Sequence, residues 1–160
     1  MKLSFFPRRH LVLRSPVSPE EVLRRLSERV EPKRRLRFGR ERPFEGVVSS
    51  EGFEINRIIF YRNSFLPLVE GSVQRDGAGS LIDAELTLHP FVAVVMAVFF
   101  TLTGLFGIAS SISFYGEGRF QPLEFPVPLG LFGGGFVLMH GAFALEVGSV
   151  RRLLEEVARP

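Results

Sequence analysis

The segment FVAVVMAVFFTLTGLFGIASSI, from Phe91 to Ile112, has no charged side chain and decides how the rest of the chain is organised. As a helix rising 1.5 Å per residue it extends over about 33 Å, and the hydrocarbon core of a bilayer is about 30 Å thick. Core helices of soluble proteins seldom stay apolar on every side over such a length. We therefore predict a transmembrane helix over residues 91–112.

A second apolar segment follows closely along the chain. The sequence FPVPLGLFGGGFVLMHGAFAL, residues 125–145, contains no Asp, Glu, Lys or Arg. It predicts a second transmembrane helix over residues 125–146, which an external loop over residues 113–124 joins to the first. Most of the 20 basic residues precede residue 91, whereas the loop holds only Arg119. Because basic residues are retained on the cytoplasmic side, we expect both termini in the cytoplasm.

Small residues recur at intervals of four in both predicted spans. Such residues allow close approach of helix backbones in lipid. They predict packing of the two helices on each other or, alternatively, self-association or docking on another membrane protein. Gly130 with Gly134 and Thr103 with Gly107 have this spacing, and Gly141 extends the smooth surface of the second span.

Two ionisable residues lie in or beside the second span. His140 is a candidate for a proton or ligand role because ionisable residues inside membranes are costly. Near the inner end of the span it is more commonly bonded to a neighbouring carbonyl or to interfacial water. We expect Glu146 at the inner membrane interface, where a carboxylate is solvated.

Residues 1–90 predict a cytoplasmic α+β domain. A strand is expected over residues 10–15 and a helix over residues 19–30, with Ser18 as its N-cap and Pro19 in its first turn. Beyond Phe44 the apolar residues recur with a period close to two, which is typical of strands. Four antiparallel strands in a meander are expected, with the helix covering one face; their ranges are 44–48, 53–61, 65–75 and 81–88.

The C-terminal residues 147–160 predict a short cytoplasmic helix. Its apolar residues recur at helical spacing, so this helix can dock on the sheet through Val150, Leu153, Leu154 and Val157. Within the sheet, Gly46 and Gly71 occupy matching places in two strands and suggest bulges or strong coiling.

A polybasic run before the first predicted strand of the meander is the strongest candidate contact surface. It consists of Lys33, Arg34, Arg35, Arg37, Arg40 and Arg42. Near a bilayer such residues attract anionic lipids; alternatively the run is a solvated loop that enforces topology. Nucleic acid binds the same composition, but a membrane-tethered domain always has lipid nearby, so nucleic acid is the less favoured partner.

The triplet Arg62-Asn63-Ser64 interrupts two apolar runs. We interpret it as a turn or bulge between strands, because Asn and Ser side chains satisfy backbone groups in turns. The alternative is recognition, with Arg62 presented to a headgroup or protein partner.

The sequence contains no recognisable catalytic constellation. The absence of Cys excludes disulfides and thiolate chemistry, and none of the common hydrolase, zinc or phosphate-loop motifs is present. We expect neither metal nor cofactor, and a protein that is not an enzyme.

The run YRNSFLP, with Gly71 and the LHPF that opens the first span, resembles an uncharacterised family of small bacterial membrane proteins with two hydrophobic segments. The resemblance covers roughly residues 44–100. It implies a bacterial inner-membrane setting and no catalytic residues. The order of strand, helix, meander and helix is also similar to helix-grip, START-like ligand-binding folds, as an analogy of fold only.

Taken together, these features predict a membrane-anchored scaffold or accessory protein with an unidentified protein partner or a second copy of itself. The alternative is a binder of lipid or of a small apolar ligand, with a cleft between helix and sheet.

Overall fold

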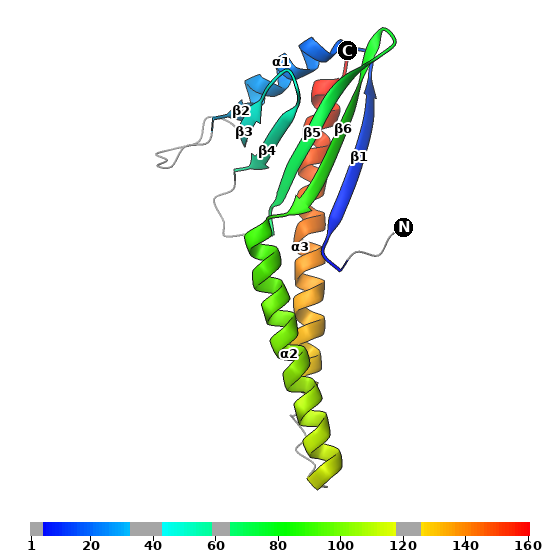
Figure 1. Cartoon of the computed structure of the whole chain (residues 1–160). Coiled ribbons are helices and arrows are strands. Elements are labelled where there is room, and N and C mark those ends of the chain that lie inside the picture. Colours follow the sequence, from blue (N-terminus) through cyan, green and yellow to red (C-terminus); the bar gives the residue numbers. More distant parts are fainter. Residues whose placement is uncertain (1–4, 33–42, 59–64, 118–125) are drawn as a thin grey trace. The chain divides into compact units, whose positions relative to one another are not determined.

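The computed structural model describes residues 5–32, 43–58, 65–117 and 126–160. They form two compact units, which are Met1–His89 with Ala142–Pro160 (unit 1) and Pro90–Gly141 (unit 2). Figure 1 labels the strands β1 (Arg8–Ser15), β2 (Val30–Glu31), β3 (Phe44–Val48), β4 (Phe53–Arg57), β5 (Pro67–Asp76) and β6 (Gly79–Leu88). The helices are α1 (Pro19–Arg29), α2 (Pro90–Glu117) and α3 (Pro126–Ala158).

Unit 1 contains one six-stranded sheet in the order β1-β6-β5-β4-β3-β2. The α+β class is confirmed, but the sheet is six-stranded and mixed, where four antiparallel strands were predicted. β1 adds to the edge of the meander by pairing antiparallel with β6 over its whole length. At the opposite edge, β2 pairs in parallel with β3 and makes the sheet mixed. The pairing of β1 with β6 joins segments across α1 and four other strands, and local periodicity carries no information about such a pair.

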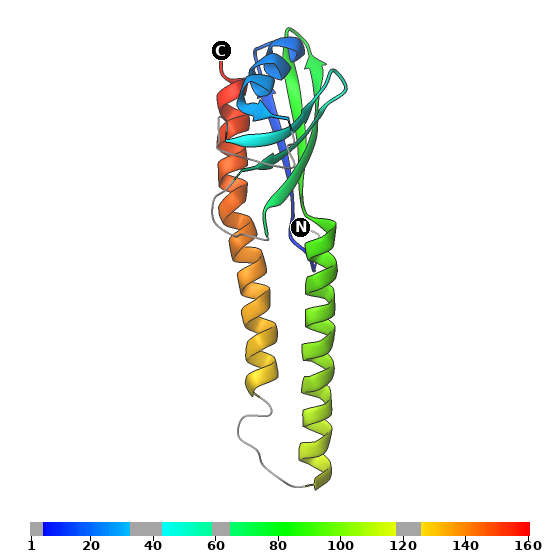
Figure 2. The ribbon, with the colours of Figure 1, turned by 90° about the vertical axis from the view of Figure 1, so that its left-hand side faces the viewer.

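Helix α1 begins where its sequence dictates. The Ser18 side chain accepts a hydrogen bond of 3.4 Å from the backbone N–H of Glu21, and Pro19 occupies the first turn. Glu20 and Glu21 lie in the same turn, where carboxylates interact favourably with the positive end of the helix dipole. The helix buries Val22 and Leu26, and Figure 2 shows it across one end of the sheet.

The core of unit 1 lies on one face of the sheet. In β6, buried residues alternate with partly exposed ones, which places Ile82, Ala84 and Leu86 on the inner face. The end of α3 covers this face and buries Val150, Leu153, Leu154 and Val157, so the predicted docking of the C-terminal helix is confirmed (Figure 2). Ser15 in β1 donates a hydrogen bond of 2.8 Å to the carbonyl of Ala158 and anchors the end of this helix.

The second predicted span and the predicted C-terminal helix are one helix. α3 continues through residues 146 and 147, where the sequence analysis placed a boundary, so the helix count is corrected to three among the described residues. Gly148 is a poor helix former, but one glycine costs only about 1 kcal/mol. The burial of four apolar side chains beyond it outweighs that cost.

Unit 2 consists of α2 and the first part of α3. Two helices of the described chain are long and apolar enough to cross a membrane, namely α2 over Pro90–Ile112 and α3. Within unit 2 the two helices contact each other through aromatic rings. The ring centre of Phe100 lies 4.9 Å from that of Phe132 and 6.5 Å from that of Phe136.

Candidate functional site

The predicted headgroup or partner contacts lie outside the described residues. They are Lys33, Arg34, Arg35, Arg37, Arg40, Arg42 and Arg62, together with the triplet Arg62-Asn63-Ser64. Their roles stay predictions.

Of the predicted packing glycines, Gly107 lies against the other helix of unit 2, whereas Gly130, Gly134 and Gly141 do not. A Cβ atom added to Gly130, Gly134 or Gly141 would meet no other heavy atom of the described chain within 4 Å. A Cβ on Gly135 would lie 2.7 Å from the Phe99 ring, and one on Gly107 would lie 3.4 Å from Pro128. Association of the three open glycines with another helix remains a prediction.

Among the described residues of unit 2, the side chains of Thr103, Ser111 and His140 bond to the backbone of their own helix. The hydroxyl of Thr103 donates a bond of 2.8 Å to the carbonyl of Phe99. The Nδ1 atom of His140 lies 3.1 Å from the carbonyl oxygen of Phe136, and its ring stacks on the Phe136 ring at 4.1 Å. This is the carbonyl contact that its position in the sequence suggests.

A cleft in unit 1 brings together charged residues that are far apart in the sequence. It lies between the end of α1, the start of β3, the end of β4 and the last part of α3, and its volume is about 250 Å³. We call it the α1–α3 cleft. Its lining consists of Arg29, Pro43, Phe44, Arg57, Ser149, Arg152, Leu153 and Glu156.

Ordinary secondary structure places these residues. Arg29 is the last residue of α1. Phe44 and Arg57 are directly opposite each other in the β3–β4 register, so both side chains lie on the inner face of the sheet. The residues from α3 recur at intervals of three or four and therefore share one side of that helix.

The two arginines at the sides of the cleft form ion pairs. Arg57 donates a hydrogen bond of 2.5 Å to Glu146, whose side chain is 3% exposed. The expectation of a solvated Glu146 is therefore wrong, because the carboxylate is buried and neutralised by β4. Arg29 lies 3.3 Å from the carboxylate of Glu156.

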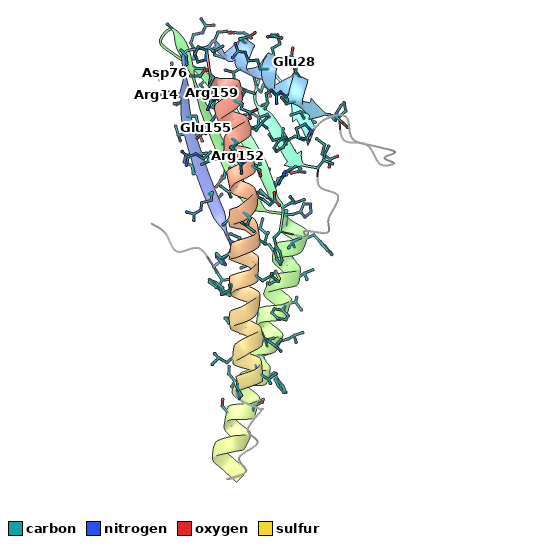
Figure 3. All side chains as sticks on the ribbon, turned by 180° about the vertical axis from the view of Figure 1, so that it is seen from behind. Arg14, Glu28, Asp76, Arg152, Glu155 and Arg159 are labelled. Carbon is teal, nitrogen blue, oxygen red and sulfur yellow. The ribbon has the colours of Figure 1, made fainter. Side chains whose placement is uncertain are left out.

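Arg152 differs from these two arginines. Among the described residues, its side chain makes one hydrogen bond of 3.3 Å, from Nε to the carbonyl of Gly148 in its own helix. Its neighbour Arg151 instead forms a bond of 2.7 Å with Glu155 on the exposed side of α3. Figure 3 labels Arg152 and Glu155 on this part of the helix.

The outer face of the sheet carries exposed ion pairs. Arg8 pairs with Glu85, His10 lies 2.5 Å from Asp83, and Arg14 lies 3.2 Å from Asp76 near the β5–β6 turn (Figure 3). Exposed pairs of this kind contribute little stability. Within the described ranges there is no group of three or more His, Asp or Glu residues that could hold a metal ion.

The sequence suggested a cleft between helix and sheet but did not identify the residues that line the α1–α3 cleft. The burial of Leu153 was predictable from the helical spacing, and that spacing also places Ser149, Arg152 and Glu156 beside it. The contribution of Arg29 and Arg57 to the cleft was not predictable, because it depends on how α1 and the β3–β4 pair lie against α3 in the folded unit.

Comparisons with known proteins do not identify a family for this chain. No model of a known protein family matches the sequence, and no curated protein matches it either. Among solved structures, the chain is similar to CalU16 from Micromonospora echinospora, with 16% sequence identity and a TM-score of 0.36 over 83% of this chain and 88% of that one.

Proposed function

We propose that this chain is a non-enzymatic, membrane-anchored scaffold or accessory protein. It would present unit 1 at the cytoplasmic face of a bacterial inner membrane, with both spans crossing the bilayer. The bacterial setting rests on the YRNSFLP signature, and the orientation rests on the excess of basic residues outside the spans.

The observation that carries this proposal is the exposure of the apolar helices. Only 11% of the apolar window in α2 and 17% of that in α3 is buried inside the chain. Large side chains such as Phe91, Leu102 and Val137 are 71%, 61% and 71% exposed. Surface of this kind is costly in water and suits a lipid environment.

Membrane extraction and topology reporters test the anchoring. We expect the full chain to resist alkaline extraction from membranes. Alkaline phosphatase fused after residue 118 should be active, and green fluorescent protein fused after Pro160 should fluoresce. The matched variant Leu102→Arg should weaken insertion, because Arg at the centre of a span costs about 3 kcal/mol. Release by alkali, or the reverse reporter pattern, would contradict the proposal.

Affinity capture tests the accessory role. The detergent-solubilised full chain would be captured and its associated proteins and lipids identified by mass spectrometry, with a capture from cells that lack the chain as the control for non-specific recovery. A reproducible partner is expected in the native sample only. If neither a protein nor a lipid is recovered, both the accessory role and the ligand-binding alternative are wrong.

The ligand-binding alternative also has support. The α1–α3 cleft, lined by residues of two helices and of the sheet, supports this alternative, and Phe44 and Leu153 give the cleft an apolar part. Its arginines do not suit a purely apolar ligand.

A further inference from the structure

We propose that the α1–α3 cleft binds an anionic phosphate group that is attached to a small, partly apolar molecule. The shared chemistry is a phosphate ester, whether it comes from a phospholipid headgroup or from a soluble phosphorylated compound. This inference deepens the ligand-binding alternative and concerns a different set of arginines from the polybasic run.

Unused hydrogen-bond donors are the first argument. A guanidinium has five N–H donors, arranged in a fork that suits phosphate oxygens. Among the described residues, Arg152 uses its Nε alone, in a long bond to a backbone carbonyl, and Arg57 donates through one terminal nitrogen to Glu146. Donors on two sides of the cleft therefore remain available for a ligand.

The balance of charge is the second argument. The lining holds three guanidiniums and one carboxylate, that of Glu156. Counting Glu146 behind Arg57 as well, the group carries three positive and two negative charges, so one positive charge remains. The negative end of the α1 dipole opposes an anion here, and Arg29, at the last residue of that helix, offsets it.

The size and lining of the cleft restrict the ligand. Sites for drug-sized ligands measure roughly 300–1,000 Å³, so about 250 Å³ suits a headgroup-sized fragment. Phe44 and Leu153, each 4% exposed, provide an apolar wall beside the arginines. A phosphate joined to a glycerol or a comparable short carbon group satisfies both parts of the lining.

The lipid source rests on the proposed anchoring, whereas the phosphate site itself does not. Ser149, which lines the cleft, lies eight residues beyond Gly141, the last residue of unit 2. A site so close in sequence to a span is suited to a headgroup from the adjacent leaflet. A soluble phosphate ester would reach the same arginines from the cytoplasm.

Calorimetry and native mass spectrometry on the full chain test the site. In zwitterionic detergent, inorganic phosphate and glycerol phosphate are titrated into the native chain. In a second arm, the chain is placed in nanodiscs of phosphatidylcholine with or without phosphatidylglycerol. Native mass spectrometry then identifies the lipid that stays bound to the chain after the chain is released from the nanodisc. The variants are Arg152→Gln and Ser149→Phe, and the matched control is Arg151→Gln, which removes the same charge one residue away and outside the lining.

We expect Arg152→Gln to weaken glycerol phosphate binding about tenfold, the usual effect of losing a hydrogen bond to a charged group. Ser149→Phe should weaken it by filling the cleft without changing the charge, and Arg151→Gln should leave it unchanged. Binding of glycerol phosphate assigns a soluble source, and selective retention of phosphatidylglycerol assigns a lipid source. If neither glycerol phosphate nor phosphatidylglycerol binds, the proposed site is wrong. It is also wrong if Arg151→Gln and Arg152→Gln weaken binding equally. Failure of the anchoring proposal alone would leave the glycerol phosphate arm intact.

Discussion

The ion pair between Arg57 and Glu146 shows how one residue of β4 allows a carboxylate to be buried in α3. Glu146 is enclosed and is within 2.5 Å of the Arg57 guanidinium. An isolated carboxylate in such a place is strongly unfavourable. Removal of the cation beside it is therefore costly, whereas the intact ion pair is weak evidence for a net gain in stability.

Removal of Arg57 should accordingly destabilise unit 1. We expect Arg57→Met to lower the free energy of unfolding by about 3 kcal/mol, because the variant takes away a cation that lies against the buried Glu146 carboxylate. The double variant Arg57→Met/Glu146→Leu should recover most of this loss. Denaturation of the full chain in detergent, followed by circular dichroism, measures both. An Arg57→Met chain as stable as the native one would show that the burial of Glu146 does not depend on Arg57.

Gly46 illustrates a second constraint at the residue scale. Its φ of 155° is one that side-chain-bearing residues rarely adopt, and a Cβ atom there would lie 2.0 Å from the carbonyl oxygen of Glu54 in the paired strand. The strand glycine of the sequence analysis is thus required by a close approach of two backbones.

Gly46→Ala should therefore separate β3 from β4, and we expect a loss of at least about 2 kcal/mol in unit 1. The matched control is Gly148→Ala in α3, where an added Cβ atom meets nothing within 4 Å. Because alanine is the better helix former, that variant should gain up to about 1 kcal/mol. Hydrogen exchange of residues 44–57 distinguishes them, and equal protection in the two variants would refute the argument.

At the scale of elements, ion pairs within helix α1 predict that the helix is sensitive to acid. Arg24 and Arg25 donate hydrogen bonds to Glu21 and lower its pKa from 4.5 to about 2. A carboxylate whose pKa is lowered by folding stabilises the folded state above its unfolded pKa. This contribution is lost as the pH falls through the folded pKa.

Stability of α1 should therefore decline between about pH 4.5 and about pH 2 as Glu21 becomes protonated. Glu21→Gln should remove this part of the acid sensitivity and should be less stable than the native chain at neutral pH. Hydrogen exchange of residues 19–29 at stepped pH measures it, with Glu85→Gln on the outer face of the sheet as a control. An unchanged acid response in Glu21→Gln would count against the role of these bonds.

The elements differ in how far the sequence could predict them. The Ser18 cap of α1 and the alternation in β6 are local signals, and both elements form as expected. The pairing of β1 with β6 joins residues more than sixty positions apart, and no local pattern encodes it. The same holds for the α1–α3 cleft, since Arg29, Arg57 and Arg152 meet only after the sheet and both helices have formed.

At the scale of the whole molecule, the chain uses α3 for two purposes. Its first part belongs to the apolar unit, and its last part completes the core of unit 1. The sequence indicates both uses, the first by an uncharged run and the second by apolar spacing. It does not indicate that one continuous helix serves both uses. Gly148 lies between the uncharged run and the last apolar residues, and a glycine there is compatible with two helices or with one.

Truncation tests this double use. A chain that ends at Glu146, the predicted domain boundary, should still resist alkaline extraction but should lose the fold of unit 1. It would lack the buried side chains of Val150, Leu153, Leu154 and Val157. At about 1.5–3 kcal/mol each, these amount to roughly 6–12 kcal/mol, comparable to the total stability of a small domain.

Limited proteolysis of the shorter chain should then cleave within residues 5–89, whereas a chain that ends at Arg159 should resist. A protease-resistant unit 1 in the shorter chain would show that the domain folds without α3.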